Sequence, residues 1–342
     1  MKPVTPGAPG TPMRAFVQRA YGAPGDVLRL EEVERPVADD DGVLVRVHAA
    51  SANPADWHLV RGEPYVARLQ LGLRRPSNPV PGCDLAGRVV AVGARVTTVR
   101  PGDEVYGSPF GSGLGAFAEY ASVPERQLAR KPRNLTFEQA AAVPLAAQTA
   151  LQALRDRGRI EPGQRVLIAG ASGGVGTFAV QIAKALGADV TGVCSTRNTD
   201  LVRSIGADHV IDYTHEDFTT HGRRYDLVLY LAGTQTPRAC RRVLTPKGTL
   251  VVISGDAEGR WVGAVGRIAR ALAMSPFVSQ RMVAFTMRPE RADLEFLTEL
   301  VESGRVTPVI GATRTLADVP ETIGQLESGH TRGKIVISVG AV

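Results

Sequence analysis

A glycine-rich segment in the middle of the chain has the residue types and the spacing of a phosphate-binding turn. Gly170, Gly173 and Gly176 follow the apolar run Val166–Ala169, and an amphipathic segment begins at Val175. Glycines allow a tight bend and a close approach of the backbone to a pyrophosphate, and the start of a helix attracts the anion. Because an apolar strand, this turn, a helix and a second strand follow one another, the segment predicts a dinucleotide site rather than a structural turn. The residues expected to line it are Gly170, Ser172, Gly173, Gly174, Val175 and Gly176.

The end of the second strand bears on the choice between NADH and NADPH. An NAD site usually carries Asp or Glu at this place, where the carboxylate binds the 2′-hydroxyl of the ribose. The segment Val193–Asn198 contains no acid, and the first one is Asp200. Ser195 and Arg197 can instead bind a 2′-phosphate, the arginine through charge-assisted hydrogen bonds. A polar loop with a solvated arginine is the alternative, but the residue types favour NADPH.

The pattern of apolar residues predicts a second domain around this turn, over residues 136–287. Thr136 and Gln139 have the spacing of a capping box before an alanine-rich helix that runs to Leu154. Apolar strands then alternate with helices, which implies a parallel, doubly wound sheet. The expected strands are Val166–Ala169, Val190–Cys194, His209–Tyr213, Leu227–Leu231 and Leu250–Ser254, and the expected helices are Val175–Leu186, Asp200–Ile205 and Pro237–Leu244.

The residues before and after that region have a different pattern. Residues 13 to about 132 contain short strands separated by glycine and proline turns, with nothing strongly helical, and predict a compact β-rich domain over residues 13–135. Residues 288–342, which end in the strand-like Lys334–Val339, are expected to complete it. Residues 1–12, rich in Pro and Gly, are expected to be a disordered leader.

Composition excludes several classes of protein. The chain has 342 residues, 44% of them hydrophobic and 22% charged, which is typical of soluble globular proteins of about two domains. It lacks an apolar run long enough for a membrane span and a secretory signal, so we expect a cytoplasmic protein. The net charge of +6 is spread along the chain without interleaved aromatic residues, which argues against nucleic-acid binding. Three scattered cysteines indicate a reducing compartment and no disulfide framework.

Several motifs in this order resemble the medium-chain dehydrogenase/reductase superfamily, and most closely its zinc-free NADPH:quinone oxidoreductases, including the zeta-crystallin-like enzymes. The segments that carry the resemblance are Asn53–Asp56, Pro81–Gly87, Pro101–Gly107, Gly115–Tyr120 and Gly170–Gly176. The resemblance covers nearly the whole chain from Met13. It implies an α/β protein with a GroES-like β-rich catalytic domain and a Rossmann domain, NADPH in the cleft between them, and a homodimer.

Zinc alcohol dehydrogenases of the superfamily carry a Cys at the position of Asn53 and a His-Glu pair at Cys83-Asp84. A catalytic zinc needs three protein ligands and an open position, and Asn is a poor ligand. The four-cysteine structural lobe is also missing, and Cys83 is expected to be a small buried residue. The sequence therefore predicts no metal. Without a Lewis acid, quinones and alkenes conjugated to a carbonyl become the natural hydride acceptors, because they delocalise their own negative charge.

Asn53, His58 and Tyr65 are the candidate catalytic residues. Asn53 can donate a hydrogen bond to a developing oxyanion or orient the nicotinamide ribose. His58 stands where quinone oxidoreductases often carry Tyr, and it can donate a proton near neutral pH. A packing role for His58 is an equal alternative, and Tyr65 is a second possible donor. Asp56 is expected to cap or orient this loop.

The resemblance alone supplies further cofactor residues. Thr149 matches a position that contacts the nicotinamide amide, and Tyr213 matches one that helps to hold the 2′-phosphate. Lys334 lies in a segment that returns to the cofactor cleft. Packing and turn roles stay open for each of these, and also for Ala232, Ser254 and Gly255, which end strands at the carboxyl edge of the sheet.

The acceptor is left open by the sequence. The expected activity is reduction of a quinone or another conjugated carbonyl compound, and an enoyl or alkenal reductase would use the same cofactor site. Glu63–Pro79 and Trp261–Val283 are expected to shape the acceptor pocket. A rival from another class is an NADPH-binding scaffold or sensor with little turnover, since binding is not catalysis. A weaker rival is a zinc alcohol dehydrogenase.

Overall fold

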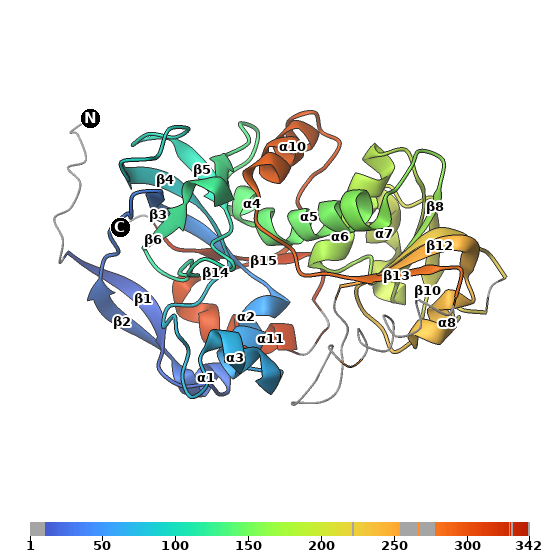
Figure 1. Cartoon of the computed structure of the whole chain (residues 1–342), viewed down its shortest axis with the longest axis horizontal. Helices are drawn as coiled ribbons and strands as arrows, with labels where there is room; N and C mark the ends of the chain where they lie inside the picture. The colour runs from blue at the N-terminus through green and yellow to red at the C-terminus, as the bar shows by residue number, and fades with distance from the viewer. Residues whose placement is uncertain are drawn as a thin grey trace. The chain divides into compact units, whose positions relative to one another are not determined.

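The structure, a computed structural model, describes residues 11–220, 222–253, 266, 278–327, 329 and 331–340. The chain divides into two compact units (Figure 1). The first unit comprises Met1–Gln148, Arg288–Glu302 and Ile310–Val342, and the second comprises Thr149–Met287 and Ser303–Val309. The sequence-based boundaries were 135/136 and 287/288, so the first one now lies after Gln148, within a helix.

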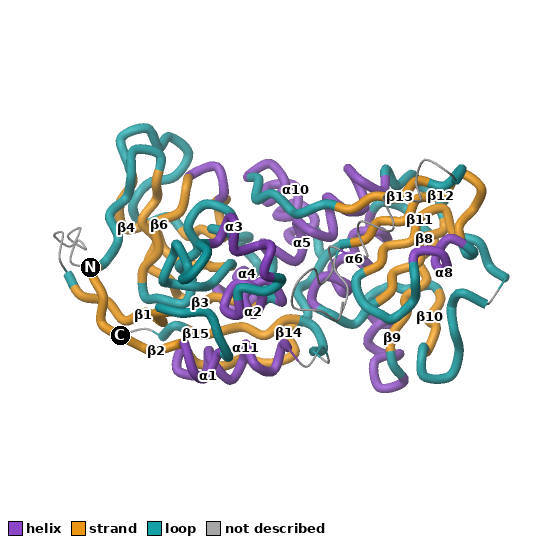
Figure 2. The backbone as a smooth tube through the Cα atoms, turned by 60° about the horizontal axis from the view of Figure 1, so that its bottom comes forward, coloured by secondary structure: helices purple, strands orange, loops and turns teal. Residues whose placement is uncertain are grey.

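The second unit is built on a six-stranded parallel sheet, whose strands Figure 2 shows side by side. The strand order is β10-β9-β8-β11-β12-β13. The order reverses between β8 and β11, and in doubly wound sheets ligands bind outside the carboxyl ends of the strands at such a point. The predicted α/β class with a doubly wound sheet is therefore confirmed. The strands are β8 (Arg165–Ala169), β9 (Asp189–Cys194), β10 (His209–Asp212), β11 (Tyr225–Tyr230), β12 (Leu244–Val252) and β13 (Arg281–Ala284).

The helices of this unit are short, apart from α6 (Gly174–Ala185). Its residues from Gly176 to Ala183 are all buried, and Gly187 with φ +84° follows its end. Among the described residues, this unit also contains α7 (Thr199–Ser204) and α8 (Pro237–Arg241). The end of α5 (Pro144–Leu151) belongs to it as well and is continued by a π-helical turn over Gln152–Gly158.

The single helix expected from Thr136 to Leu154 is wrong, because two helices form. The capping box of Thr136 and Gln139 is present and begins α4 (Phe137–Ala141). Pro144 then begins α5. Proline lacks an N–H and its ring clashes with the preceding helical turn, so it interrupts a helix unless it stands in the first turn.

The first unit is built on strands that pair antiparallel, except that β14 and β15 are parallel to each other. Its seven-stranded sheet has the order β14-β15-β3-β4-β5-β7 with β6 paired to β3, and β1 and β2 form a separate hairpin. Ile335–Ser338 pair antiparallel with Ala49–Ala52, so the end of the chain completes the sheet of its beginning (Figure 1). The strands are β1 (Pro12–Gln18), β2 (Leu28–Glu34), β3 (Gly42–Ala52), β4 (Asp84–Val92), β5 (Glu104–Gly107), β6 (Tyr120–Pro124), β7 (Leu128–Arg130), β14 (Ile310–Thr315) and β15 (Lys334–Ser338).

The expectation of no strong helix before residue 132 is wrong at α2 (Pro54–Arg61). Asn53 and Asp56 form its capping box, Pro54 occupies its first position, and Gly62 ends it with φ +61°. Every one of these is a helix start or stop signal. The described part of the first unit also contains α1 (Pro24–Val27), α3 (Arg68–Leu71), α10 (Arg291–Glu302) and α11 (Val319–Glu327).

Some expectations fall on residues that the structure does not describe. Ser254, Gly255 and the leader up to residue 10 belong to this group. So does the segment Trp261–Val283, expected to shape the acceptor pocket, apart from Gly266 and residues 278–283. Among the described residues, no helix is both long enough and apolar enough to cross a bilayer.

Candidate functional site

The predicted turn lies between the end of β8 and the start of α6. Gly170 has φ +89°, a conformation that other residues rarely adopt. A Cβ at Gly176 would lie 2.1 Å from the carbonyl oxygen of Gly170, so the first turn of α6 packs directly on the bend. At Gly173 the nearest atom to such a Cβ is 3.5 Å away. The protein itself does not need a glycine there, so the missing side chain leaves room for a group that approaches from outside.

The start of α6 supplies hydrogen-bond donors to that space. Thr177 N–H is the first to bond within the helix, to Gly173 O at 2.9 Å. The N–H groups of Gly174, Val175 and Gly176 precede it and have no helical acceptor. Together with the positive end of the helix dipole, they form an anion site. Ala232 lies beside it, because its N–H bonds Ala169 O at 3.3 Å across the point where the strand order reverses.

The carboxyl ends of β9 and β10 lie next to this turn in the sheet. Ser195 is half-buried and Arg197 is exposed. Tyr213, 53% exposed, donates its N–H to Cys194 O at 3.0 Å and so stands directly beside the end of β9. The structure thus gathers Ser195, Arg197 and Tyr213 at one edge of the sheet.

An acid that the sequence argument did not weigh also lies at this edge. Asp212 pairs in register with Cys194 and accepts hydrogen bonds from the N–H and hydroxyl of Thr214, at 2.9 and 2.7 Å. Hydrogen bonds from the side chains of Thr196 and Thr214 hold the pKa of Asp212 below its ordinary value. This carboxylate is therefore engaged by hydroxyl and backbone donors of its own loops.

Asn198 is a second residue that the sequence argument missed. It is 6% exposed, and its Nδ2 lies 3.1 Å from Ser172 Oγ and 3.2 Å from Ser195 Oγ. It therefore connects the turn after β8 with the loop after β9. Asn198 precedes α7 as an N-cap residue, but its side chain does not cap that helix.

In the first unit, five side chains form a buried polar cluster: Asn53, Asp56, Cys83, Asp84 and Lys334. None is more than 3% exposed. Lys334 Nζ lies 2.5 Å from Asn53 Oδ1, 3.2 Å from Ala52 O and 3.6 Å from Asp84 Oδ2. Asn53 Nδ2 donates to Asp84 Oδ2 at 2.9 Å and to Ser51 O at 3.2 Å. Asp84 also accepts from Ser51 Oγ and from the N–H of Leu145.

Burial sets the charges of this cluster. It raises the pKa of Asp84 and lowers that of Lys334, and the attraction between the two opposes both shifts. Asp56 is also fully buried, which raises its pKa to about 7, although Asn53 N–H donates to its Oδ2 at 2.8 Å. Burial raises the pKa of the Cys83 thiol, and the neighbouring Asp56 carboxyl raises it further. The thiol is therefore protonated at neutral pH.

These residues do not fit a catalytic zinc. A zinc site needs a thiolate or similar ligands and an open position, whereas Cys83 is a buried thiol and Asp84 is paired with an ammonium. The Nζ of Lys334 itself lies against Asn53 and supplies the positive charge in the cluster. Across the part of the chain that the structure describes, no group of three or more His, Cys, Asp or Glu side chains has the geometry to hold a metal ion.

Two expected roles are at odds with this arrangement. Lys334 was expected at the cofactor, but its ammonium is buried against Asp84 and Asn53. Asn53 was expected to donate to an oxyanion or orient the nicotinamide ribose, but both hydrogens of its amide are used by Ser51 and Asp84. The residue spacing could not show this, because Lys334 reaches Asn53 only through the pairing of β15 with β3.

The other candidates of the first unit lie on and after α2. His58 is half-buried and stacks on Trp57, with 3.6 Å between ring centroids. Its Nδ1 lies 3.0 Å from Glu63 O, and since a carbonyl only accepts, Nδ1 carries the hydrogen. The neutral ring then has its lone pair on Nε2. Tyr65 is half-buried beneath the guanidinium of Arg68, at 4.5 Å. Thr149, on α5, is 4% exposed.

The unusual pKa of Asp56 gives a pH-dependent prediction. Its folded pKa of about 7 exceeds the ordinary value of 3.8, so the folded state holds a proton that the unfolded state loses. Its contribution to the free energy of unfolding is therefore fully present below about pH 4 and is lost as the pH rises through 7. Asp56→Asn is expected to gain about 2–3 kcal/mol relative to wild type between pH 5 and pH 8. Urea denaturation at both pH values measures it, with the exposed Asp200→Asn as control. If the difference in stability between Asp56→Asn and wild type is the same at pH 5 and at pH 8, the pKa of Asp56 is not raised by burial.

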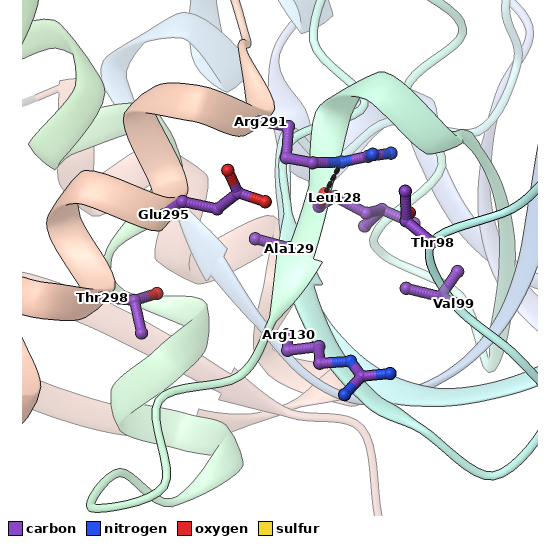
Figure 3. Close-up of a pocket in the computed structure, with 8 residues that line it drawn as sticks. All are labelled: Thr98, Val99, Leu128, Ala129, Arg130, Arg291, Glu295 and Thr298. Atoms are coloured by element: carbon purple, nitrogen blue, oxygen red, sulfur yellow. Dashed lines mark hydrogen bonds between the residues drawn. The ribbon is translucent and has the colours of Figure 1, made fainter.

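A hollow of about 250 Å³ lies elsewhere on the first unit, lined by residues of α10, of β7 and of the loop between β4 and β5 (Figure 3). Arg291 donates from Nε to Leu128 O at 3.0 Å, as Figure 3 shows. Arg130 pairs with Asp103 at 3.2 Å. Since both cations at the hollow have partners, nothing in its lining calls for a bound anion, and none of the candidate residues lies in it.

Comparison with known proteins matches both units. Residues 39–133 match the model of the alcohol dehydrogenase GroES-like domain, and residues 205–337 match that of zinc-binding dehydrogenases. The chloroplast envelope quinone oxidoreductase homolog of Arabidopsis thaliana is 31% identical, over 96% of this chain and 99% of that protein. The 2-methylene-furan-3-one reductase of Solanum lycopersicum is 35% identical, over 95% of this chain and 79% of that protein. The solved structure of the quinone oxidoreductase from Coxiella burnetii aligns with a TM-score of 0.86 at 30% identity, over 96% of this chain and 100% of that one.

Proposed function

The chain belongs to the quinone oxidoreductase-like branch of the medium-chain dehydrogenase/reductase superfamily, whose oxidoreductases bind a nicotinamide dinucleotide, and we propose that it uses NADPH, without a catalytic metal, to reduce a quinone or another conjugated carbonyl compound. The homodimer implied by the family resemblance stays a prediction.

The observation that carries the cofactor proposal is the edge formed by the carboxyl ends of β8, β9 and β10. It offers the start of α6 to a pyrophosphate and, one strand further, Ser195 and Arg197 to a 2′-phosphate. Asp212, the acid nearest in register, is held by hydroxyl and backbone donors of Thr196 and Thr214. Arg197 has the planar, always charged group that suits a phosphate. These residues fit NADPH better than NADH.

The chemistry proposed for the acceptor follows from the polar cluster. NADPH, when bound, supplies a hydride. A protein with no Lewis acid stabilises a simple alkoxide poorly, so the acceptor must carry its own delocalised charge. The residues of the protein then have to orient the acceptor, exclude water and deliver one proton to oxygen or carbon. His58 is the proposed donor, through Nε2 of its protonated ring, because Nδ1 is held by Glu63 O.

A second candidate function is reduction of an activated carbon–carbon double bond. The similarity to the tomato 2-methylene-furan-3-one reductase supports it. The same cofactor site and the same proton donor would serve this reaction. The difference lies in the acceptor pocket.

Acceptor-dependent oxidation of NADPH tests the proposed function. A panel of ortho-quinones, para-quinones, enones and alkenals is mixed with enzyme and NADPH, and the loss of reduced cofactor is followed. We expect turnover with at least one conjugated class, and the preferred class decides between the two candidate functions. Tight binding of NADPH without oxidation by any acceptor would favour a scaffold or sensor instead.

The role of His58 gives a separate prediction. His58→Phe keeps an aromatic ring against Trp57 but removes the proton, so kcat is expected to fall about a hundredfold with little change in KM for the acceptor. The matched control is His215→Phe, at a side chain that is 74% exposed. Steady-state kinetics from pH 5 to pH 9 measures both variants. An unchanged kcat and pH profile would leave His58 a packing residue.

A further inference from the structure

Asn198 occupies a position between the two serines that the proposed cofactor site uses. The segment Ser195–Asn198 turns back on itself, since Asn198 N–H donates to Ser195 O at 2.9 Å. This turn directs the side chain of Asn198 toward the loop after β8. There its Nδ2 contacts Ser172 Oγ at 3.1 Å as well as Ser195 Oγ at 3.2 Å.

The direction of these hydrogen bonds determines what the serines can offer. The amide nitrogen of asparagine has two hydrogens and no acceptor capacity, so both serine oxygens accept from it. Each hydroxyl keeps its own proton for another partner. A hydroxyl fixed in this way is a donor, and a donor favours an anion over a neutral hydroxyl group.

The surroundings of Asn198 indicate that this geometry is maintained by burial. The side chain is 6% exposed. An asparagine before a helix usually accepts a hydrogen bond from the first helical turn, but this one does not cap α7. Its amide is committed to the two serines instead.

We propose that Asn198 is a positioning residue for NADPH: it orients the hydroxyl of Ser195 as a donor to the 2′-phosphate and that of Ser172 as a donor to the pyrophosphate. The inference rests on the proposed cofactor. It makes selectivity for NADPH a property of three connected side chains, with Asn198 acting through the serines rather than on the phosphate itself.

Asn198→Asp is the sharpest test, because it changes the direction of the hydrogen bonds with almost no change in shape. A carboxylate accepts the protons of both hydroxyls and adds a negative charge beside them. The side chain of Asn198 does not cap α7, so the helix does not depend on it and is expected to stay folded. The melting temperature of the variant checks this point.

The binding probes are 2′,5′-ADP and 5′-AMP, which differ only in the 2′-phosphate, together with NADPH and NADH. We expect Asn198→Asp to weaken 2′,5′-ADP at least tenfold more than 5′-AMP, and to lower the NADPH to NADH affinity ratio likewise. NADH should weaken only a fewfold, through Ser172. Asn198→Ala is expected to lie between wild type and Asn198→Asp. Asn134→Asp, in the first unit, controls for an added carboxylate at an exposed asparagine whose amide also donates a hydrogen bond, to Val301 O at 2.9 Å.

The outcomes separate this inference from the proposed function. A wild type that prefers 2′,5′-ADP, with the preference kept in Asn198→Asp, would overturn the role of Asn198 and leave NADPH as cofactor. Equal weakening of 2′,5′-ADP and 5′-AMP would reduce Asn198 to a structural residue and so also overturn it. A wild type without preference for 2′,5′-ADP would overturn both proposals.

Discussion

Arg197→Glu is expected to lower kcat/KM for NADPH about a hundredfold or more, while kcat/KM for NADH changes less than threefold. The substitution replaces a guanidinium that can make charge-assisted hydrogen bonds to a 2′-phosphate by a carboxylate that repels it. A hundredfold loss corresponds to about 2.7 kcal/mol, the size expected for removing such bonds and adding a like charge. A glutamate at this place also resembles the acid with which NAD sites bind the ribose 2′-hydroxyl.

The matched control is Arg203→Glu, a charge reversal at the end of the neighbouring helix α7. Arg203 is exposed and pairs with Asp200 at 3.4 Å, three residues earlier. Steady-state kinetics with both cofactors and one acceptor measures the two variants side by side. If Arg197→Glu lowers kcat/KM equally for NADPH and NADH, Arg197 does not bind the 2′-phosphate. Equal selectivity losses in both variants would make the effect one of overall charge.

Lys334→Met is expected to destabilise the protein by about 3–5 kcal/mol. Lys334 and Asp84 form a fully buried pair, at 3% and 0% side-chain exposure. Removing one partner of such a pair leaves a charge buried without compensation, which costs far more than the pair itself contributes. Asn53 also loses the ammonium that its oxygen accepts from.

Urea denaturation measures this loss, and the chain offers a control in Lys184→Met. Lys184 pairs with Asp208 at 2.8 Å, but both side chains are about one-third exposed, so a change of about 1 kcal/mol or less is expected. Adding Asp84→Asn to Lys334→Met should recover part of the stability, because the uncompensated charge disappears. A loss below about 1 kcal/mol in Lys334→Met, together with weakened NADPH binding, would indicate that Lys334 binds the cofactor and does not stabilise the buried cluster.

The sequence predicted the second unit well because its signals are local. The turn Gly170–Gly176, the strand before it and the helix after it are contiguous. The alternation of strands and helices then predicts the doubly wound sheet, although not its strand order. Helix α2 was missed although Asn53, Pro54, Asp56 and Gly62 all signal it. At eight residues it is too short for apolar periodicity to stand out against the surrounding strands.

Local sequence signals could not predict the buried polar cluster. Cys83 was expected to be a small buried residue, and this is confirmed. Its contact with Asp56, and that of Asn53 with Lys334, depends on strands far apart in the chain. Asn198 differs again: its position before α7 marks it as a cap, and only the fold shows that its amide turns toward Ser172 and Ser195. Sequence signals thus located the cofactor loops, while the hydrogen bonds between them required the structure.

The most direct test of metal-free, NADPH-dependent reduction is one kinetic comparison. The protein is dialysed against a chelator, its zinc content is measured, and kcat/KM is determined with NADPH and with NADH against the best quinone or enone acceptor. We predict full activity without zinc and at least a tenfold preference for NADPH. Equal or better use of NADH, or activity that is lost with the metal and restored by zinc, would contradict it.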